Sequence, residues 1–257
     1  MALAKTTAGS GPNTTYVEYS GKHGAFVQGF GDQAEHFQIV SGTIDTMWIE
    51  DPMSPPAGKP RKANAEKIPV KLVVRLADGS ERVAIKFPLH TTEDKNIGFG
   101  AAKVVAQLYG TLLHHFTETE AKRPSQVQLR TGLGTAAEGA DAASWFVADS
   151  WDGEAWQKKA IQKVWGFNAD DTPNLGDPKV VDGQTTYGMP SDFTETFRDK
   201  TFVKFDKVWK LVQDMVAPFE AERAARRQNQ GQAHSSHDAG IDPDAVDEAQ
   251  DAMRQRG

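Results

Sequence analysis

The pattern that most constrains the fold is the clearest alternation in the chain, in which large apolar residues recur at every second position over 68–89, interrupted at Asp78 and Gly79. Alternation with a period of two on both sides of an Asp-Gly turn predicts a β-hairpin with one buried face. That face contains Ile68, Val70, Leu72, Val74, Leu76, Val83, Ile85, Phe87 and Leu89. Because successive side chains of a strand point to opposite sides, the other face carries the cations Lys71, Arg75, Arg82 and Lys86.

Further strand and helix signals flank this hairpin. Residues 37–48 form a predicted strand with Val40, Gly42, Ile44 and Trp48 on its inward face, and Gly42 marks a bulge or bend. Apolar residues spaced by three and four predict an amphipathic helix over 98–116, and two strands follow at 126–133 and 144–149. Three strands, a helix and two strands are the order of an OB-fold, a five-stranded Greek-key barrel. We therefore predict a mainly β fold with helices (α+β) built on an OB-like five-stranded barrel, although other small barrels and sandwiches fit the same signals.

Composition and helical spacing assign the rest of the chain. We predict an irregular N-terminal arm at 1–33, the barrel at 34–165, a loop or linker at 166–190, a C-terminal helix at 191–227 and an acidic, disordered tail at 228–257. An apolar seam runs along the predicted C-terminal helix and consists of Phe202, Phe205, Trp209, Val212, Val216 and Phe219. Pro218 is expected to end or kink this helix. The seam either packs on the chain's own barrel or forms a protein-interaction surface, for a homo-oligomer or for another protein.

The sequence lacks the signatures of common catalytic sites. It contains no Cys, which excludes disulfides, thiol catalysis and cysteine-bound zinc. Walker A, dinucleotide-binding, HExxH and GxSxG motifs are absent, and the adjacent His114 and His115 point in different directions on a helix. We therefore expect a protein that is not an enzyme and uses no cofactor or metal. Without a secretion signal or an apolar run near the roughly 18 residues of a membrane span, a cytoplasmic location is expected.

Charge is unevenly distributed along the chain. Positions 59–130 hold 13 basic and 7 acidic side chains, a net +6, whereas 1–58 (2 and 6) and 131–257 (14 and 22) carry −4 and −8. Cations and exposed rings together are typical of proteins that bind single-stranded nucleic acid, because cations contact phosphates and rings stack on bases. The candidate nucleic-acid-binding residues are Lys59, Arg61, Lys62, Lys71, Arg75, Arg82, Lys86, Arg130, Trp145, Trp151, Trp156, Lys158 and Lys159. Trp145 and Phe146 are neighbours on a strand, so one ring must point outward, whereas Trp48 is expected in the core with Ile44.

Five stretches of sequence carry a family resemblance: the strand FQIVSGTIDTMWIE, the hairpin KIPVKLVVRLADGSERVAIKF, the helix GAAKVVAQLYGTLL and the pair QVQLRTGL and SWFVADSWDGEAWQKK. In this pattern, which covers residues 37–160, the chain resembles the single-stranded DNA-binding proteins of lytic bacteriophages. The resemblance implies an OB-fold, cooperative coating of single strands, oligomerisation and a tail that recruits replication or transcription proteins. It also implies action in the cytoplasm of a bacterial host, in some cases together with RNA polymerase.

Two functions from different classes fit these observations. The first is binding of single-stranded DNA largely without sequence preference, in phage DNA replication, recombination or transcription. The basic strand face and stacking aromatics would form its binding surface. The alternative is an OB-like interaction module that docks on a polymerase or host factor through the seam, with an incidental basic face.

Overall fold

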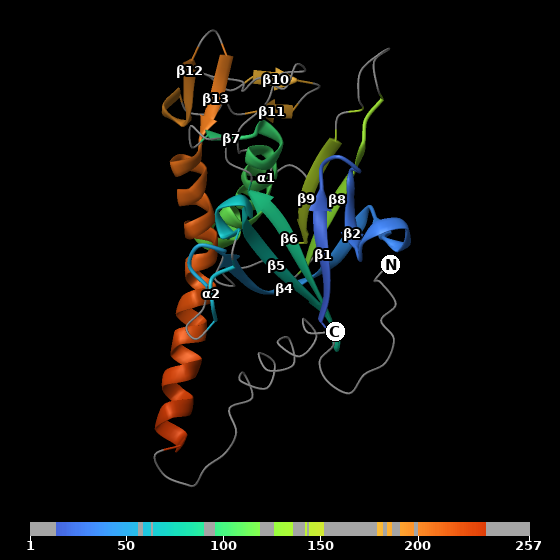
Figure 1. Cartoon of the computed structure of the whole chain (residues 1–257). Coiled ribbons are helices and arrows are strands. Elements are labelled where there is room, and N and C mark those ends of the chain that lie inside the picture. Colours follow the sequence, from blue (N-terminus) through green and yellow to red (C-terminus); the bar gives the residue numbers. More distant parts are fainter. Residues whose placement is uncertain are drawn as a thin grey trace. The chain divides into compact units, whose positions relative to one another are not determined.

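The structure is a computed structural model that describes residues 14–55, 59–62, 64–89, 96–118, 126–135, 142, 144–151, 179–181, 184–186, 191–197 and 200–234. The chain divides into two compact units, Met1–Ala217 and Pro218–Gly257. The described residues are mainly β with two α-helices (Figure 1). This confirms the predicted α+β class.

Among the described residues, the largest sheet has eight strands in the order β3-β2-β1-β6-β5-β4-β8-β9. These are β1 (Thr14–Ser20), β2 (Ala25–Gln28), β3 (Glu35–Phe37), β4 (Ile39–Glu50), β5 (Val70–Asp78), β6 (Glu81–Leu89), β8 (Gln126–Leu133) and β9 (Ser144–Trp151). Strand β1 is parallel to β6, whereas the other neighbouring pairs are antiparallel. The five strands predicted from the sequence are β4, β5, β6, β8 and β9, so the sheet exceeds the expected barrel by three strands.

Two of the three additional strands correct the prediction for the N-terminal arm. Glycines interrupt any long period in the predicted arm at 1–33, yet β1 and β2 form there and extend the sheet, while β3 lies at the start of the predicted barrel. Residues 1–13 of the arm lie outside the described residues. The alternation in β1 is present but short, since Thr15 and Val17 are buried and Tyr16 between them is exposed. Its partner β6 lies far along the sequence, so the pairing that stabilises β1 is not visible in the local pattern.

The hairpin of β5 and β6 has the predicted faces. Leu72, Val74, Leu76, Val83, Ile85, Phe87 and Leu89 are all buried. Asp78 pairs with Glu81, which leaves Gly79 and Ser80 as the two-residue loop, one position later than expected. The side-chain period of two therefore determined the faces correctly even though the turn is displaced.

Strand β4 belongs to both halves of the sheet. It pairs with β8 from Ile39 to Gly42 and with β5 from Thr43 to Glu50. A Cβ atom at Gly42 would lie 2.8 Å from the carbonyl oxygen of Ala77, so a larger residue could not make this approach. The bend predicted at Gly42 coincides with this change of partner strand.

The sheet curls into a half-barrel in which the β1–β2 hairpin approaches β8 and β9 (Figure 1). At the hairpin turn, a Cβ atom on Gly24 would come within 2.4 Å of the carbonyl carbon of Gly132 in β8. Four rings pack inside the curl, with centroids 5.5 to 6.5 Å apart: Tyr19, Phe26, Phe87 and Phe146. They come from β1, β2, β6 and β9, so this cluster joins the N-terminal hairpin to the last strand.

Helix α1 (Phe99–Glu118) packs against β9. Ala102, Val105, Leu108 and Leu112 of its predicted apolar stripe are buried. The Thr111 hydroxyl donates a hydrogen bond of 3.0 Å to the carbonyl oxygen of Ala148 in β9. The predicted amphipathic helix is therefore confirmed, and it covers the inner side of the sheet.

Several smaller elements complete the described part. Strands β7 (Asn96–Ile97), β12 (Thr194–Phe197) and β13 (Lys200–Lys204) form a second sheet in the order β12-β13-β7. Strands β10 (Lys179–Val181) and β11 (Gln184–Thr186) form a hairpin inside the predicted 166–190 linker. The short 3-10 helices are η1 (Gly31–Gln33), η2 (Ala65–Lys67) and η4 (Ser191–Phe193). The rest of the predicted linker lies outside the described residues.

Helix α2 (Phe205–His234) differs from the predicted 191–227 helix at both ends. Phe202 of the predicted seam lies in β13, opposite Glu195 of β12, because strand pairing there replaces the helical spacing. The helix continues through Pro218, where the two units divide, and extends into the predicted tail. Residues 235–257 of that tail lie outside the described residues. No described helix has the length and apolar character to span a membrane.

Candidate nucleic-acid interface

The outer face of β5 and β6 carries four of the predicted binding residues, and we call it the cation face. Lys71 and Arg75 lie on β5, and Arg82 and Lys86 lie on β6, on the side opposite Leu72, Val74, Val83 and Ile85. Val73 and Ala84 lie between these cations on the same side and are fully buried. These cation side chains are 20–31% exposed. Their placement on one face is confirmed, while a role in binding remains a prediction.

Each cation on this face is paired with a carboxylate. Lys71 Nζ lies 2.5 Å from Glu18 Oε2, and Lys86 Nζ lies 3.0 Å from Glu50 Oε1. Asp45 Oδ2 lies 2.7 Å from Arg75 Nε and 3.4 Å from Arg82 Nε. Four cations and three carboxylates leave a net charge of +1, so the face is less positive than the count of Lys and Arg implies.

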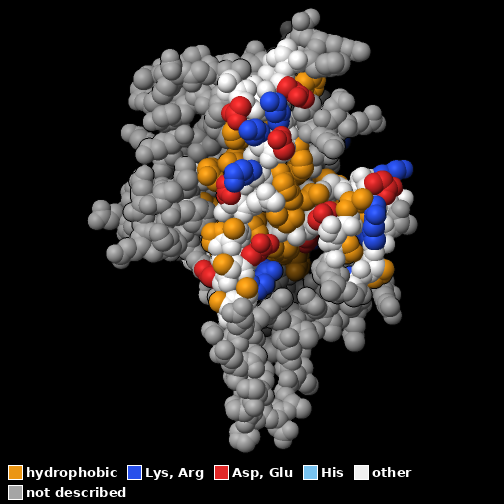
Figure 2. Space-filling model, turned by 90° about the vertical axis from the view of Figure 1, so that its left-hand side faces the viewer, with side chains coloured by type: hydrophobic (Ala, Val, Ile, Leu, Met, Phe, Trp, Pro, Cys, Tyr) orange, Lys and Arg blue, Asp and Glu red, His pale blue; other side chains and the backbone are white. Residues whose placement is uncertain are grey.

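These ion pairs are weak enough that a cation could exchange its carboxylate partner for another anion. Their side chains are 20–46% exposed. A pair exposed to this degree contributes only about 0–1 kcal/mol to stability, because water and salt screen it. A phosphate can therefore displace a carboxylate at small cost. Lys and Arg side chains likewise lie among Asp and Glu side chains on the side of the molecule shown in Figure 2.

A β-bulge in β4 changes the face on which Trp48 lies. The register against β5 shifts between Ile44 and Thr46. Beyond this shift Met47 is fully buried, and Trp48 lies opposite Val73 on the cation face, where its ring is half-buried. The expectation of a core tryptophan is therefore wrong, because one additional residue moves every later side chain of a strand to the other side.

Tyr16 of β1 adds a second ring to the cation face. Lys86 Nζ lies 5.0 Å from the centroid of the Tyr16 ring, within the range of a cation–π interaction, and the Tyr16 side chain is 40% exposed. Trp48, Val73, Lys86 and Glu18 are register partners across four adjacent strands, so in strand order Lys86 of β6 lies between Trp48 of β4, two strands away, and Tyr16 of the neighbouring β1. The sequence prediction missed Tyr16, although the alternation in TTYVEYS was a signal that could have found it.

Three predicted cations belong to the loop that joins β4 to β5. Lys59, Arg61 and Lys62 are exposed. Arg61 Nη2 lies 2.8 Å from Met53 Sδ, and no ion pair joins the three cations to the described carboxylates. The loop is anchored by Ala65, which is fully buried. These loop cations therefore keep their charge uncompensated within the described part of the chain.

Arg130 of β8 forms a more buried ion pair. Its Nη2 lies 2.6 Å from Asp149 Oδ2 in β9, and the Asp149 side chain is only 1% exposed. The other carboxylate oxygen of Asp149 is buried without a hydrogen-bond partner. Arg130 thus balances a buried charge, which gives it a structural role, while its predicted role in nucleic-acid binding is not tested by this geometry.

The predicted aromatics of β9 separate as expected for a regular strand. Phe146 is in the core, and the adjacent Trp145 is 43% exposed, which confirms that one ring faces outward. The Trp145 ring lies over Gly132 of β8, where a Cβ atom would be 2.6 Å from the indole. Trp151 is half-buried at the end of the strand. Trp156, Lys158 and Lys159 lie outside the described residues.

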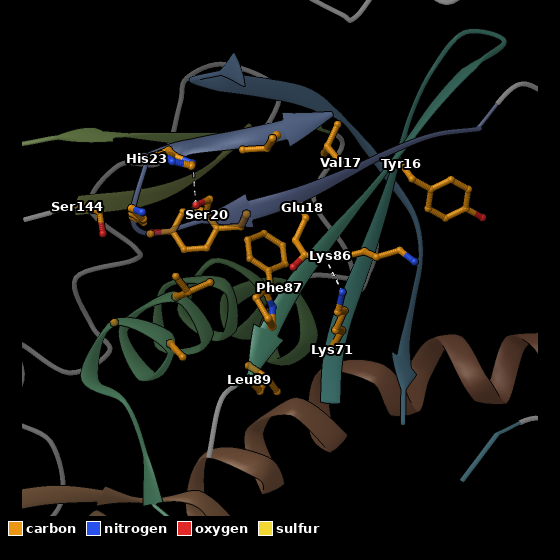
Figure 3. A pocket seen from close by; sticks show the side chains of 18 of the residues that line it. Tyr16, Val17, Glu18, Ser20, His23, Lys71, Lys86, Phe87, Leu89 and Ser144 are labelled. Atoms are coloured by element: carbon orange, nitrogen blue, oxygen red, sulfur yellow. Dashed lines mark hydrogen bonds and ion pairs between the residues drawn. The ribbon is translucent and has the colours of Figure 1, made fainter. Parts of the chain in front are cut away.

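A groove of about 770 Å³ adjoins the cation face, bordered by the β1–β2 hairpin, the ends of β5 and β6, and the first turns of α1 (Figure 3). Lys71, Lys86 and Tyr16 line it together with residues that the sequence prediction did not include. Its apolar floor includes Phe87, Leu89 and Val104. The groove thus extends the candidate site beyond the strands that carry the predicted residues.

The predicted protein-interaction seam is largely buried within the chain. Val212, Val216 and Phe219 are at most 4% exposed. Phe205 and Trp209 are half-buried and stack on each other, with ring centroids 5.4 Å apart. Of the two interpretations of the seam, packing within the first unit accounts for Val212 and Val216.

The resolved pKa shifts lie around α1 and α2. Lys207 Nζ lies 2.7 Å from Asp192 Oδ2, and this hydrogen bond lowers the pKa of Asp192 and raises the pKa of Lys207. Burial raises the pKa of Tyr109 on α1, and the nearby charge of Asp214 on α2 acts in the same direction. The Asp192–Lys207 pair links η4 to the start of α2, so its role is structural.

The described residues were also compared with the requirements of a metal site, and the chain with known proteins. Within the described ranges, no three His, Asp or Glu side chains are grouped so that they could hold a metal ion. No protein-family model, curated protein or solved structure matches the chain. The observations that bear on function are therefore the cation face and the rings and loop cations beside it.

Proposed function

We propose that this protein binds single-stranded DNA largely without sequence preference and performs no catalysis. The observation that carries the proposal is the placement of Lys86 of β6 beside the Tyr16 ring of β1, in the register row that also contains Trp48 of β4, on the outer face of the sheet. Phosphates would contact the cations, and bases would stack on the rings, as in other proteins that bind single strands. The exposed cations at 59–62 would add contacts at one end of this row.

The strand order supports an OB-fold as the core of the sheet. The segment β6-β5-β4-β8-β9 corresponds to strands 3-2-1-4-5 of the predicted barrel, with α1 between the third and fourth strands. OB-folds bind oligonucleotides on the face of strands 2 and 3 and with the loops between strands 1 and 2 and between strands 4 and 5. In this chain those places are the cation face, the loop with Lys59, and the loop before Trp145. The N-terminal hairpin would then stand beside the third strand as an addition to the barrel.

The biological setting follows from the resemblance alone. By analogy with the bacteriophage proteins, the protein would coat single strands during phage DNA replication, recombination or transcription in a bacterial cytoplasm. Self-association and a replication or RNA polymerase partner belong to the same proposal. The half-buried stack of Phe205 and Trp209 is the remaining part of the seam that such a partner could contact.

The proposal is tested by titrating the intrinsic tryptophan fluorescence with oligothymidine at low and high salt, with duplex DNA as the control. We expect quenching by the single strand that weakens steeply as salt increases, because binding releases counterions from the phosphates. A gel-shift assay at low salt provides the independent readout. Absence of binding in both assays would reject DNA binding and favour the alternative, an interaction module whose basic face is incidental.

Removing three cations from the cation face should weaken binding and reduce its salt dependence. For Lys71→Ala, Arg75→Ala and Lys86→Ala combined, we expect the slope of log affinity against log salt to decrease by about 2, since each phosphate contact contributes about 0.7 for a single strand. The matched control changes Lys204, Lys207 and Lys210 to Ala, a set whose side chains are also hydrogen-bonded or ion-paired. Equal slopes for the two triple variants would contradict the assignment of the cation face.

Removing the competing carboxylates should have the opposite effect. Glu18→Gln with Glu50→Gln frees Lys71 and Lys86 from their partners, so we expect affinity for oligothymidine to rise roughly 2- to 10-fold at low salt. Asp214→Asn, which removes the partner of Lys210 on α2, is the control and should leave affinity unchanged. Unchanged or weaker binding by the double variant would show that phosphates do not occupy the positions of these carboxylates.

A further inference from the structure

Phe30 has the most exposed ring among the large apolar side chains described, at 97%. It follows β2 and lies between Gly29 and Gly31, whose φ angles of 82° and 66° are in the left-handed region that glycine adopts readily. The ring is therefore presented outward by a tight local backbone conformation. A fully exposed phenylalanine makes no contribution to the core, and its place on the border of the groove leaves its ring accessible to a ligand bound there.

The charges around the groove favour an anionic occupant. Its described border contains three cations, Lys22, Lys71 and Lys86, and a single carboxylate, that of Glu18. Lys22 is exposed on the turn between β1 and β2 and has no ion pair with a described carboxylate. Lys71 and Lys86 are thus on the β5–β6 side of the groove (Figure 3), and Lys22 is on the turn of the β1–β2 hairpin.

The groove is continuous with the cation face. Tyr16, Lys71, Lys86 and Glu18 belong to both, and Glu18 is ion-paired with Lys71, so a single strand that enters the groove from the cation face passes one carboxylate that is already compensated by a cation. Phe87, Leu89 and Val104 of the groove's lining are at most 2% exposed, so the ring available for stacking a base is the exposed Phe30 at the border, while the border lysines suit phosphates.

We propose that this groove binds the nucleotides that continue the single strand from the cation face, with Phe30 as a stacking ring and Lys22 as a phosphate contact. The inference rests on the proposed function and extends it to a second part of the binding path. It assigns a role to the N-terminal hairpin, which the five-stranded barrel does not require.

The test measures the affinity of the full-length protein for oligothymidines of about 4 to about 16 nucleotides, the range of site sizes of OB-folds. In the parent protein affinity should rise with length until both the cation face and the groove are filled. In Phe30→Ala the rise should stop at a shorter length, and affinity for the longest oligomer should fall roughly 5- to 150-fold, the loss expected for one stacking contact. Lys22→Ala should reduce the salt slope for the longest oligomer only.

Two further variants keep the test specific. Phe30→Trp preserves a stacking ring and should retain the parent's affinity, with additional quenching from the new indole. Ile39→Ala, which removes another exposed apolar side chain outside the groove, should bind like the parent. Because Phe30 and Lys22 are exposed, these variants should also unfold like the parent.

The outcomes separate the two proposals. If Phe30→Ala and Lys22→Ala bind every length like the parent, while the cation-face triple variant is weakened, the groove assignment is overturned and the proposed function stands. If the parent itself binds no oligothymidine of any length, both are overturned.

Discussion

Phe87→Ala is expected to lower the free energy of unfolding by about 3–5 kcal/mol, the usual cost of truncating a buried phenylalanine. Phe87 is 1% exposed and contacts the rings of Tyr19, Phe26 and Phe146, so its removal opens a cavity between the N-terminal hairpin and the rest of the sheet. Urea unfolding followed by circular dichroism measures the effect. The loss should be large because three other strands contribute rings to the same cluster.

The matched control for this prediction is Phe30→Ala, which removes the same side chain from an exposed position. Its free energy of unfolding should change by no more than about 0.5 kcal/mol. If both variants lose less than about 1 kcal/mol, the four rings do not form a packed cluster and the closure of the half-barrel by the hairpin is wrong.

Arg130→Ala is expected to lower the free energy of unfolding by about 3–5 kcal/mol as well, for an electrostatic reason. The substitution leaves the carboxylate of Asp149, which is 1% exposed, buried without its cation. Replacing both partners by apolar residues, Arg130→Met with Asp149→Leu, should restore most of the stability, since no uncompensated charge then remains. Urea unfolding of the two variants at neutral pH provides the comparison.

The same pair of variants decides between two roles of Arg130. If the apolar double variant is stable and binds oligothymidine like the parent, Arg130 balances a buried charge and contacts no phosphate. If it is stable but binds more weakly, Arg130 has both roles. A single Arg130→Ala variant as stable as the parent would contradict the structural role.

The sequence predicted correctly those parts of the fold that depend only on the spacing of neighbouring residues. The alternation over β5 and β6 placed the cations on one face, because a strand's side-chain period is two wherever the strand lies. The stripe from Ala102 to Leu112 likewise predicted α1 and its buried side. The rule that neighbouring residues of a strand face opposite sides placed either Trp145 or Phe146 outside, and Trp145 is the exposed one.

Errors occurred where a distant partner or a single extra residue decides the outcome. The bulge in β4 turns Trp48 outward, since its position depends on the register against β5 and not on the spacing from Ile44. Phe202 fits the helical spacing of the seam, yet pairing with β12 places it in a strand. Strand β1 shows a short alternation next to a glycine-rich segment, and its place in the sheet depends on pairing with the distant β6.

The sequence by itself determined that the chain forms an antiparallel hairpin with a basic outer face, a helix on the sheet and two further strands, because each of these follows from the period of neighbouring residues. Only the tertiary structure decided what surrounds that face. Pairing with Glu18, Asp45 and Glu50 compensates most of its charge, and the bulge together with β1 brings Trp48 and Tyr16 to either side of Lys86 in strand order. These contacts join residues far apart in the chain, and their geometry depends on strand order and register, which local periodicity does not encode.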